Sequence, residues 1–143
     1  MKKLIISGTG IKYHAHLTDE TVKYLENSDI VLFLVNEPMM KAWIQEHNNN
    51  TFDLDHIYTA HDERATAYQK IAEHIMCQFI QYDNVNAILY GHPYVCATPA
   101  IKASALAREN GIDIISLPGI SSEACMYSDL MINPMKEGVQ SYE

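Results

Sequence analysis

The amino-acid sequence predicts an α/β fold, a parallel sheet of about five strands with helices on both faces. Short apolar runs alternate with segments of helical periodicity, which is typical of repeated strand–helix–strand units. The run at 87–90 is apolar throughout, as a strand covered on both faces is. The five runs expected to form strands are residues 4–6, 30–35, 54–58, 87–90 and 112–115.

The segments between these runs carry signals for helices. Thr18 is expected to cap the first helix, although Thr21 stands where a capping box has Glu or Gln. The second helix, residues 38–47, opens with proline, which suits a first helical turn. A long helix is expected over residues 62–82, where apolar side chains recur at spacings of three and four. The face that they form, which includes Ala65, is expected to pack on the core.

Two strands are followed by loops that have the same pattern of small and rigid residues. Gly91-His92-Pro93 separates the strand at 87–90 from a helix expected at 99–108, which Gly111 would end as a left-handed C-cap. Residues 118–122 form the second loop, before another apolar helix. Ligands of open parallel sheets bind outside the carboxyl ends of the strands. We therefore expect these two loops to hold one ligand between them.

The first strand is also followed by a glycine-rich turn, Ser7-Gly8-Thr9-Gly10. Tyr13 replaces the third glycine of the dinucleotide-binding pattern G-x-G-x-x-G, although Glu37 stands at about the right distance for the acidic residue of that pattern. A tight turn without a ligand explains the glycines equally well.

Composition excludes several classes of function. The 143 residues include 18 acidic and 10 basic ones, giving a formal charge of −8, and no cluster of lysine and arginine occurs, so nucleic-acid binding is not expected. No apolar run approaches the roughly 20 residues of a membrane span, and no signal peptide is recognisable. The three cysteines suit neither a disulfide framework nor a metal site, and His14 and His16 lack ligand partners at suitable spacing. We expect a cytoplasmic protein without a metal or a membrane partner.

The two loops, together with Asp129-Leu130 and residues 140–143, resemble the tetrapyrrole methylase superfamily of S-adenosylmethionine-dependent methyltransferases. Within it the chain is most similar to the borosin branch, the peptide backbone α-N-methyltransferases of ribosomally synthesised, modified peptides. The resemblance implies S-adenosylmethionine as cofactor. It also implies that the cofactor is bound by residues of the two loops, namely Tyr90, Gly91, His92, Pro93, Val95, Ser121 and Ser122.

The residues alone leave a simpler role open for the same loops. His92 can cap a turn, and both serines can be helix N-caps. Tyr94 occupies a position where the borosin branch favours glycine, so its ring is expected to narrow the cleft.

Methylation of an amide nitrogen requires help, because its lone pair is delocalised into the carbonyl group. A base must remove the proton, and a cation can stabilise the charge on oxygen. By resemblance to borosin methyltransferases, Tyr58, Arg64 and Tyr68 are the catalytic residues. Arg64 and Tyr68 are four residues apart and therefore share a helix face. The alternative is that Tyr68 belongs to the core and that Arg64 pairs with Asp62 or Glu63.

The resemblance also suggests how the chain is organised. Residues 1–134 would form the cofactor-binding N-terminal domain, and residues 135–143 would begin the crossover to a second domain that this sequence does not contain. The expected function is methylation of a peptide. The alternatives are methylation of a small molecule or a tetrapyrrole by the same fold, and a truncated domain without catalysis that acts through dimerisation or a partner. We expect a homodimer, and a separately encoded second domain is a further possible partner.

Overall fold

The computed structural model describes residues 1–142 of the chain. Its five strands form one sheet in which every neighbouring pair is parallel, in the order β3-β2-β4-β1-β5, so the predicted fold class is confirmed. The strands are β1 (Lys3–Gly8), β2 (Ile30–Leu34), β3 (Thr51–Asp53), β4 (Asn84–Leu89) and β5 (Asp113–Ser116).

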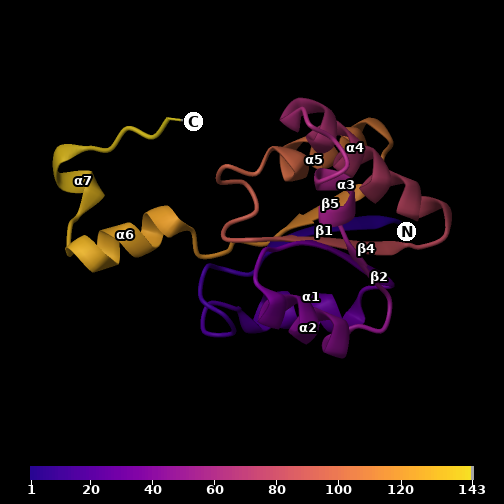
Figure 1. Ribbon diagram of the computed structural model, residues 1–143, viewed down its shortest axis with the longest axis horizontal. Coiled ribbons are helices and arrows are strands. Elements are labelled where there is room, and N and C mark those ends of the chain that lie inside the picture. Colours follow the sequence, from indigo (N-terminus) through magenta and orange to yellow (C-terminus); the bar gives the residue numbers. More distant parts are fainter. Residues whose placement is uncertain (143) are drawn as a thin grey trace.

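Helices cover both faces of the sheet (Figure 1). Helices α1 (Asp19–Asn27) and α2 (Pro38–His47) lie on one face, and α3 (Asp55–Tyr58), α4 (Arg64–Cys77) and α5 (Thr98–Glu109) lie on the other. Each face has its own buried cluster of apolar side chains. Leu32 and Ile71 belong to the α4 and α5 side, while Phe33 and Trp43 belong to the α1 and α2 side.

Several local predictions are confirmed. The Thr18 hydroxyl oxygen accepts a hydrogen bond from the backbone N–H of Thr21 at 3.1 Å and so caps α1. Gly111 has φ +66° immediately after α5, the conformation expected of a left-handed C-cap. The long helix is shorter than predicted, because a 3₁₀ turn, η1 (Gln78–Ile80), follows α4. On its core side Ala67 is buried, whereas Ala65, which was expected there, is exposed.

The prediction of a third strand at residues 54–58 is wrong. The strand is β3, which pairs with Val31–Phe33 of β2, and the residues after it form the one-turn helix α3. The reason is local, because the Asp53 carboxylate accepts the backbone N–H of Asp55 at 3.0 Å and starts a helical turn. Leu54 is buried and Ile57 packs on the same core cluster, a spacing of three that fits a helix.

The end of β4 also differs from the prediction. The strand stops at Leu89, and Tyr90, which was expected to be buried in it, is 47% exposed. The N–H of Tyr90 still donates to the Leu34 carbonyl at 3.1 Å, so the backbone continues the ladder for one residue while the side chain leaves the core.

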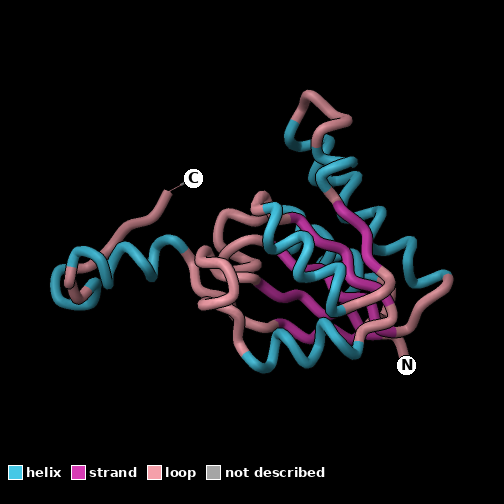
Figure 2. The backbone as a smooth tube through the Cα atoms, turned by 60° about the horizontal axis from the view of Figure 1, so that its bottom comes forward, coloured by secondary structure: helices cyan, strands magenta, loops and turns pink. Residues whose placement is uncertain are grey.

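The C-terminal part of the chain extends away from the sheet (Figures 1 and 2). It contains α6 (Ser122–Leu130) and α7 (Pro134–Glu137), and neither helix buries a residue. The packed body continues as far as Leu117, which is 4% exposed. The domain boundary at residue 134 stays a prediction.

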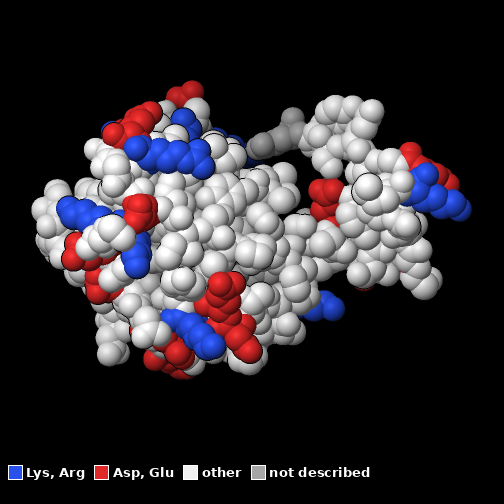
Figure 3. All heavy atoms as spheres, turned by 180° about the vertical axis from the view of Figure 1, so that it is seen from behind, with Lys and Arg blue, Asp and Glu red and all other residues white. Residues whose placement is uncertain are grey.

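The surface carries no concentration of positive charge on the face shown in Figure 3, where acidic and basic side chains are interspersed. Among residues 1–142, no helix combines the length and the apolar character needed to cross a membrane.

Candidate functional site

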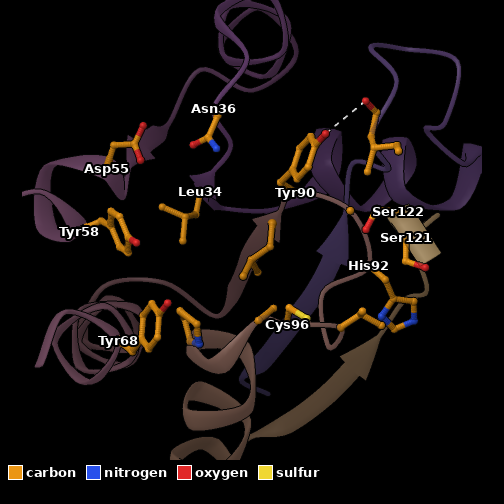
Figure 4. A pocket seen from close by; sticks show the side chains of 16 residues that line it. Leu34, Asn36, Asp55, Tyr58, Tyr68, Tyr90, His92, Cys96, Ser121 and Ser122 are labelled. Carbon is orange, nitrogen blue, oxygen red and sulfur yellow. Dashed lines mark hydrogen bonds between the residues drawn. The ribbon is translucent and has the colours of Figure 1, made fainter. Parts of the chain in front are cut away.

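A cavity of about 320 Å³ opens at the carboxyl ends of β2 and β4, a size typical of small-ligand sites. In Figure 4, Tyr58 and Tyr68 lie at one end of it, His92 and Ser121 lie at the other, and Tyr90 lies between them. Eight of the sequence-predicted site residues line the cavity: Tyr58, Tyr68, Tyr90, Gly91, His92, Val95, Ser121 and Ser122. Pro93 and Arg64 do not.

Three glycines, one at the end of β1 and two from the loops after β4 and β5, meet beneath the end that contains His92. A Cβ atom on Gly8 would lie 2.2 Å from the Gly91 carbonyl oxygen, and one on Gly119 would lie 2.3 Å from the same oxygen. Gly91 itself has φ +72°, a conformation that L side chains rarely adopt. We call Gly8, Gly91 and Gly119 the glycine cradle. It brings three backbone segments into direct contact, which a side chain at Gly8 or Gly119 would prevent.

Gly10 joins the same contact through its backbone. The N–H of Gly10 donates to the Gly91 carbonyl at 3.2 Å, and the N–H of Gly91 donates to the Gly10 carbonyl at 3.0 Å. The turn after β1 is therefore bonded to the loop after β4. His16 stabilises the turn after β1, because its Nδ1 accepts the backbone N–H groups of Ile11 and Lys12.

The His92 side chain both lines the cavity and caps its own turn. Its Nδ1 accepts the backbone N–H of Tyr94 at 3.1 Å, which places the proton of a neutral ring on Nε2. Pro93 is buried, and its ring closes over the Gly8 backbone. The prediction that Tyr94 narrows the cleft is wrong for this cavity, because its hydroxyl reaches Ser104 of α5 at 2.9 Å, away from the lining.

Ser121 and Ser122 bring the start of α6 to the cavity. Ser121 is the N-cap, and its hydroxyl oxygen accepts the N–H of Ala124 at 3.1 Å. Ser122 is the first residue of the helix and also lines the cavity. The N-cap interpretation is thus correct for Ser121, and the helix start faces the same space as His92.

The opposite end of the cavity is aromatic. Tyr58 ends α3 and Tyr68 lies on α4, and their rings stack with centroids 6.1 Å apart and planes inclined by 25°. Arg64 is the exposed first residue of α4, one helical turn before Tyr68. Within the described part of the chain, no ion pair joins Arg64 to Asp62 or Glu63.

Relatives of known sequence match nearly the whole chain. It matches the family of Tetrapyrrole (Corrin/Porphyrin) Methylases over residues 3–142. A protein of Serendipita vermifera subsp. bescii, named as a methyltransferase and ribosomally synthesised type I borosin cyclic peptide precursor, is 39% identical over 98% of the chain. A protein of Lentinula edodes, named as a methyltransferase and ribosomally synthesised cyclic peptide lentinulin A precursor, is 34% identical over 98% of the chain.

The chain belongs to the tetrapyrrole methylase family. It spans 35% of the Serendipita relative and 34% of the Lentinula relative, or about a third of their lengths. Solved structures share the fold at lower identity. Uroporphyrin-III-C-methyltransferase from Thermus thermophilus gives a TM-score of 0.66 at 19% identity, covering 92% of this chain and 54% of the other. Diphthine synthase gives 0.72 at 13% identity, covering 96% and 52%.

Sequence reasoning missed two polar residues of this tetrapyrrole methylase cavity, Asn36 and Asp55. Asn36 is the second residue after β2, so the rule that ligands bind at the carboxyl ends of strands would have found it. Asp55 was not predicted because it falls within residues 54–58, which were wrongly expected to form a strand. Among the lining residues that the structure describes, it is the one carboxylate, and none of them is a lysine or arginine.

Asp55 is bonded to a lysine outside the lining. Lys41 of α2 contacts Asp53 at 2.8 Å and also pairs with Asp55. Desolvation by itself lowers the pKa of Lys41, but the hydrogen bonds and negative charges of the two aspartates outweigh it, so that the pKa lies above its ordinary value of 10.5.

Proposed function

We propose that this chain forms the S-adenosylmethionine-binding part of a methyltransferase that methylates backbone amide nitrogens of a peptide. The observation that supports this most is one cavity with two different ends, a glycine cradle with a helix start at one and two stacked tyrosines at the other. Relatives whose names join methyltransferase and peptide precursor support a peptide as the acceptor.

The chemistry of the lining fits this cofactor. When bound, S-adenosylmethionine supplies an electrophilic methyl group on a sulfonium. The N–H groups at the start of α6, around Ser121 and Ser122, suit its carboxylate. A dinucleotide would bury its negatively charged diphosphate here without a cation among the described lining residues, and burying an unpaired charge is costly. The sulfonium of S-adenosylmethionine is positively charged and needs no such cation.

The tyrosine end suits the acceptor. A tyrosinate there can take the proton of an amide nitrogen, and Tyr58 and Tyr68 both have access to the cavity. Arg64 lies outside the lining, but it begins the helix that carries Tyr68 and is exposed. We assign it to stabilising negative charge on the amide oxygen of a peptide that lies across the start of α4.

The charge of the cavity separates a peptide acceptor from a tetrapyrrole. Tetrapyrrole precursors carry several carboxylates, which are bound best by arginine and lysine. The described lining contains neither residue and adds the carboxylate of Asp55. A neutral backbone amide therefore suits this cavity better than a polycarboxylate.

Further protein surface is expected to cover the projecting helices. Several apolar side chains of the C-terminal part are exposed: Met126, Leu130, Met131, Ile132 and Met135. Apolar patches of this kind mark association sites. They support a homodimer or a separately encoded second domain as partner, and a cytoplasmic location stays part of this proposal.

The test has two stages. Calorimetric titration with S-adenosylhomocysteine should show saturable binding that weakens in Tyr90→Ala, with Tyr82→Ala, which lies outside the cavity, as control. Mass spectrometry of a neutral model peptide with S-adenosylmethionine should then show added methyl groups that disappear in Tyr68→Phe. Absence of binding at millimolar ligand would contradict the proposal for this chain. Binding followed by methylation of a tetrapyrrole but of no peptide would contradict the peptide assignment.

A further inference from the structure

Lys41 connects the two sides of the molecule at the edge of the sheet. It lies on α2, which covers one face, and its ammonium reaches Asp53 at the end of β3 and Asp55 at the start of α3 on the other face. The Lys41 side chain is 24% exposed and the two aspartates are 20% and 29% exposed, so these charges are partly buried. We call these three residues the lysine clamp.

The segment that the clamp holds is short, and Leu54, which is 1% exposed, is its buried anchor to the core. Strand β3 has three residues, lies at the edge of the sheet and pairs with β2 alone. Helix α3 is one turn long and contains no buried residue. Its start depends on Asp53, whose carboxylate accepts the N–H of Asp55 and also contacts Lys41 through its other oxygen.

This short turn carries a residue of the proposed chemistry. Asp55 and Tyr58 are three residues apart in α3, so they share a face, and both line the cavity. Tyr58 stacks on Tyr68 of α4. The direction of the Tyr58 ring into the cavity therefore depends on the orientation of α3.

We propose that Lys41 is a positioning residue, whose clamp on Asp53 and Asp55 fixes α3 so that Tyr58 faces the acceptor end of the cavity. This inference rests on the proposed methyl transfer for its kinetic consequence, but the clamp itself is independent of it. Without the ammonium, two carboxylates would be left close together with no counterion, and their repulsion would move α3. Asp55 would also place an unpaired charge in the cavity.

The informative variants are Lys41→Met and Lys41→Arg. Methionine keeps much of the chain length and removes the charge, while arginine restores a cation that can bond both carboxylates. Lys70→Met is the matched control, because Lys70 pairs with Glu73 at 2.9 Å on the exposed side of α4. Asp55→Asn relieves the repulsion in the Lys41→Met background.

Two readouts distinguish positioning from general structural damage. In Lys41→Met we expect kcat for methyl transfer to fall about 10- to 100-fold, the range for a misplaced catalytic group. The Kd for S-adenosylhomocysteine should stay within about twofold of wild type, because the cradle end is untouched. Lys41→Arg and Lys70→Met should keep the wild-type kcat.

Hydrogen exchange tests the clamp without any activity. The N–H of Tyr58 bonds to the Leu54 carbonyl and that of Thr59 to the Asp55 carbonyl, so both report on α3. They should exchange faster in Lys41→Met and recover in Lys41→Arg and on adding Asp55→Asn. Unchanged exchange and unchanged kcat in Lys41→Met would overturn the inference. If Lys41→Met does not fold, Lys41→Gln, which also removes the charge and leaves the two carboxylates facing each other, must loosen α3 in the folded protein, and unchanged exchange there would overturn it too. If the wild type transfers no methyl group, the exchange result still decides the clamp, while the proposed function fails separately.

Discussion

Replacing Gly119 by alanine should damage both stability and cofactor binding, because the new methyl group has no space. Its Cβ would lie 2.3 Å from the Gly91 carbonyl oxygen and 3.2 Å from the Gly8 Cα, against a shortest normal approach of 3.0 Å. The first contact is about 0.7 Å too short, and both neighbours are backbone. Overpacking of this kind costs about 1–3 kcal/mol. Gly119 has no positive φ in the left-handed range, so the cost is steric.

Gly111→Ala is the matched control for Gly119→Ala. Nothing lies within 4 Å of a Cβ at Gly111, but its φ of +66° makes alanine cost about 1–2 kcal/mol through backbone strain. Urea unfolding should therefore show similar losses in the two variants. Calorimetric titration with S-adenosylhomocysteine should show weaker binding in Gly119→Ala alone, since only that loop borders the cavity. Equal affinity in both variants would refute the role of the glycine cradle in shaping the site.

Three further predictions address single side chains. His92→Ala leaves the Tyr94 N–H without its acceptor, so the free energy of unfolding should fall by about 1 kcal/mol, and calorimetric titration should show weaker binding of S-adenosylhomocysteine, because a side chain of the cavity lining is lost. Arg64→Ala should leave the urea midpoint unchanged, because Arg64 is exposed, while methyl transfer falls about 100-fold; equal turnover would remove Arg64 from the mechanism. Burial against Phe52 lowers the pKa of His74 below its ordinary 6.5, so the unfolded chain binds the proton more readily. Urea unfolding should therefore show stability that is full above pH 6.5 and falls as pH drops toward the folded-state pKa, and His74→Gln should reduce that dependence.

Local chemistry explains which parts of the fold the sequence could predict. Four of the five strands are predicted at nearly their observed positions, because buried apolar runs are a strong signal. The strand order β3-β2-β4-β1-β5 depends on contacts far apart in the sequence and was not predicted. The third strand failed because five residues are too few to separate a period of two from a spacing of three. The hydrogen bond that the Asp53 carboxylate accepts from the N–H of Asp55 favours the helical turn over a strand.

In the candidate site, too, local features could be predicted from the sequence and long-range contacts could not. Gly91 and His92 were predicted because their turn requires an unusual backbone that few sequences allow. Asp55 and its partner Lys41 were not, since they are 14 residues apart and meet only when α2 and α3 close over opposite faces of the sheet. Arg64 matches the borosin pattern in sequence, yet it lies outside the cavity lining, so its role depends on where an acceptor lies.

The two ends of the cavity are held by different means, and this has a consequence for mutations. At one end, the backbone segments of the glycine cradle pack directly on one another, so a substitution there must affect both the fold and ligand binding. Side chains hold the other end, where the lysine clamp and the stacked tyrosines orient a one-turn helix with no buried residue. Changes at that end can move a catalytic group by an ångström while leaving the core intact. We therefore expect substitutions in the glycine cradle to lower both cofactor affinity and folding stability. Substitutions in the lysine clamp should instead lower kcat while cofactor affinity and folding stability stay close to wild type.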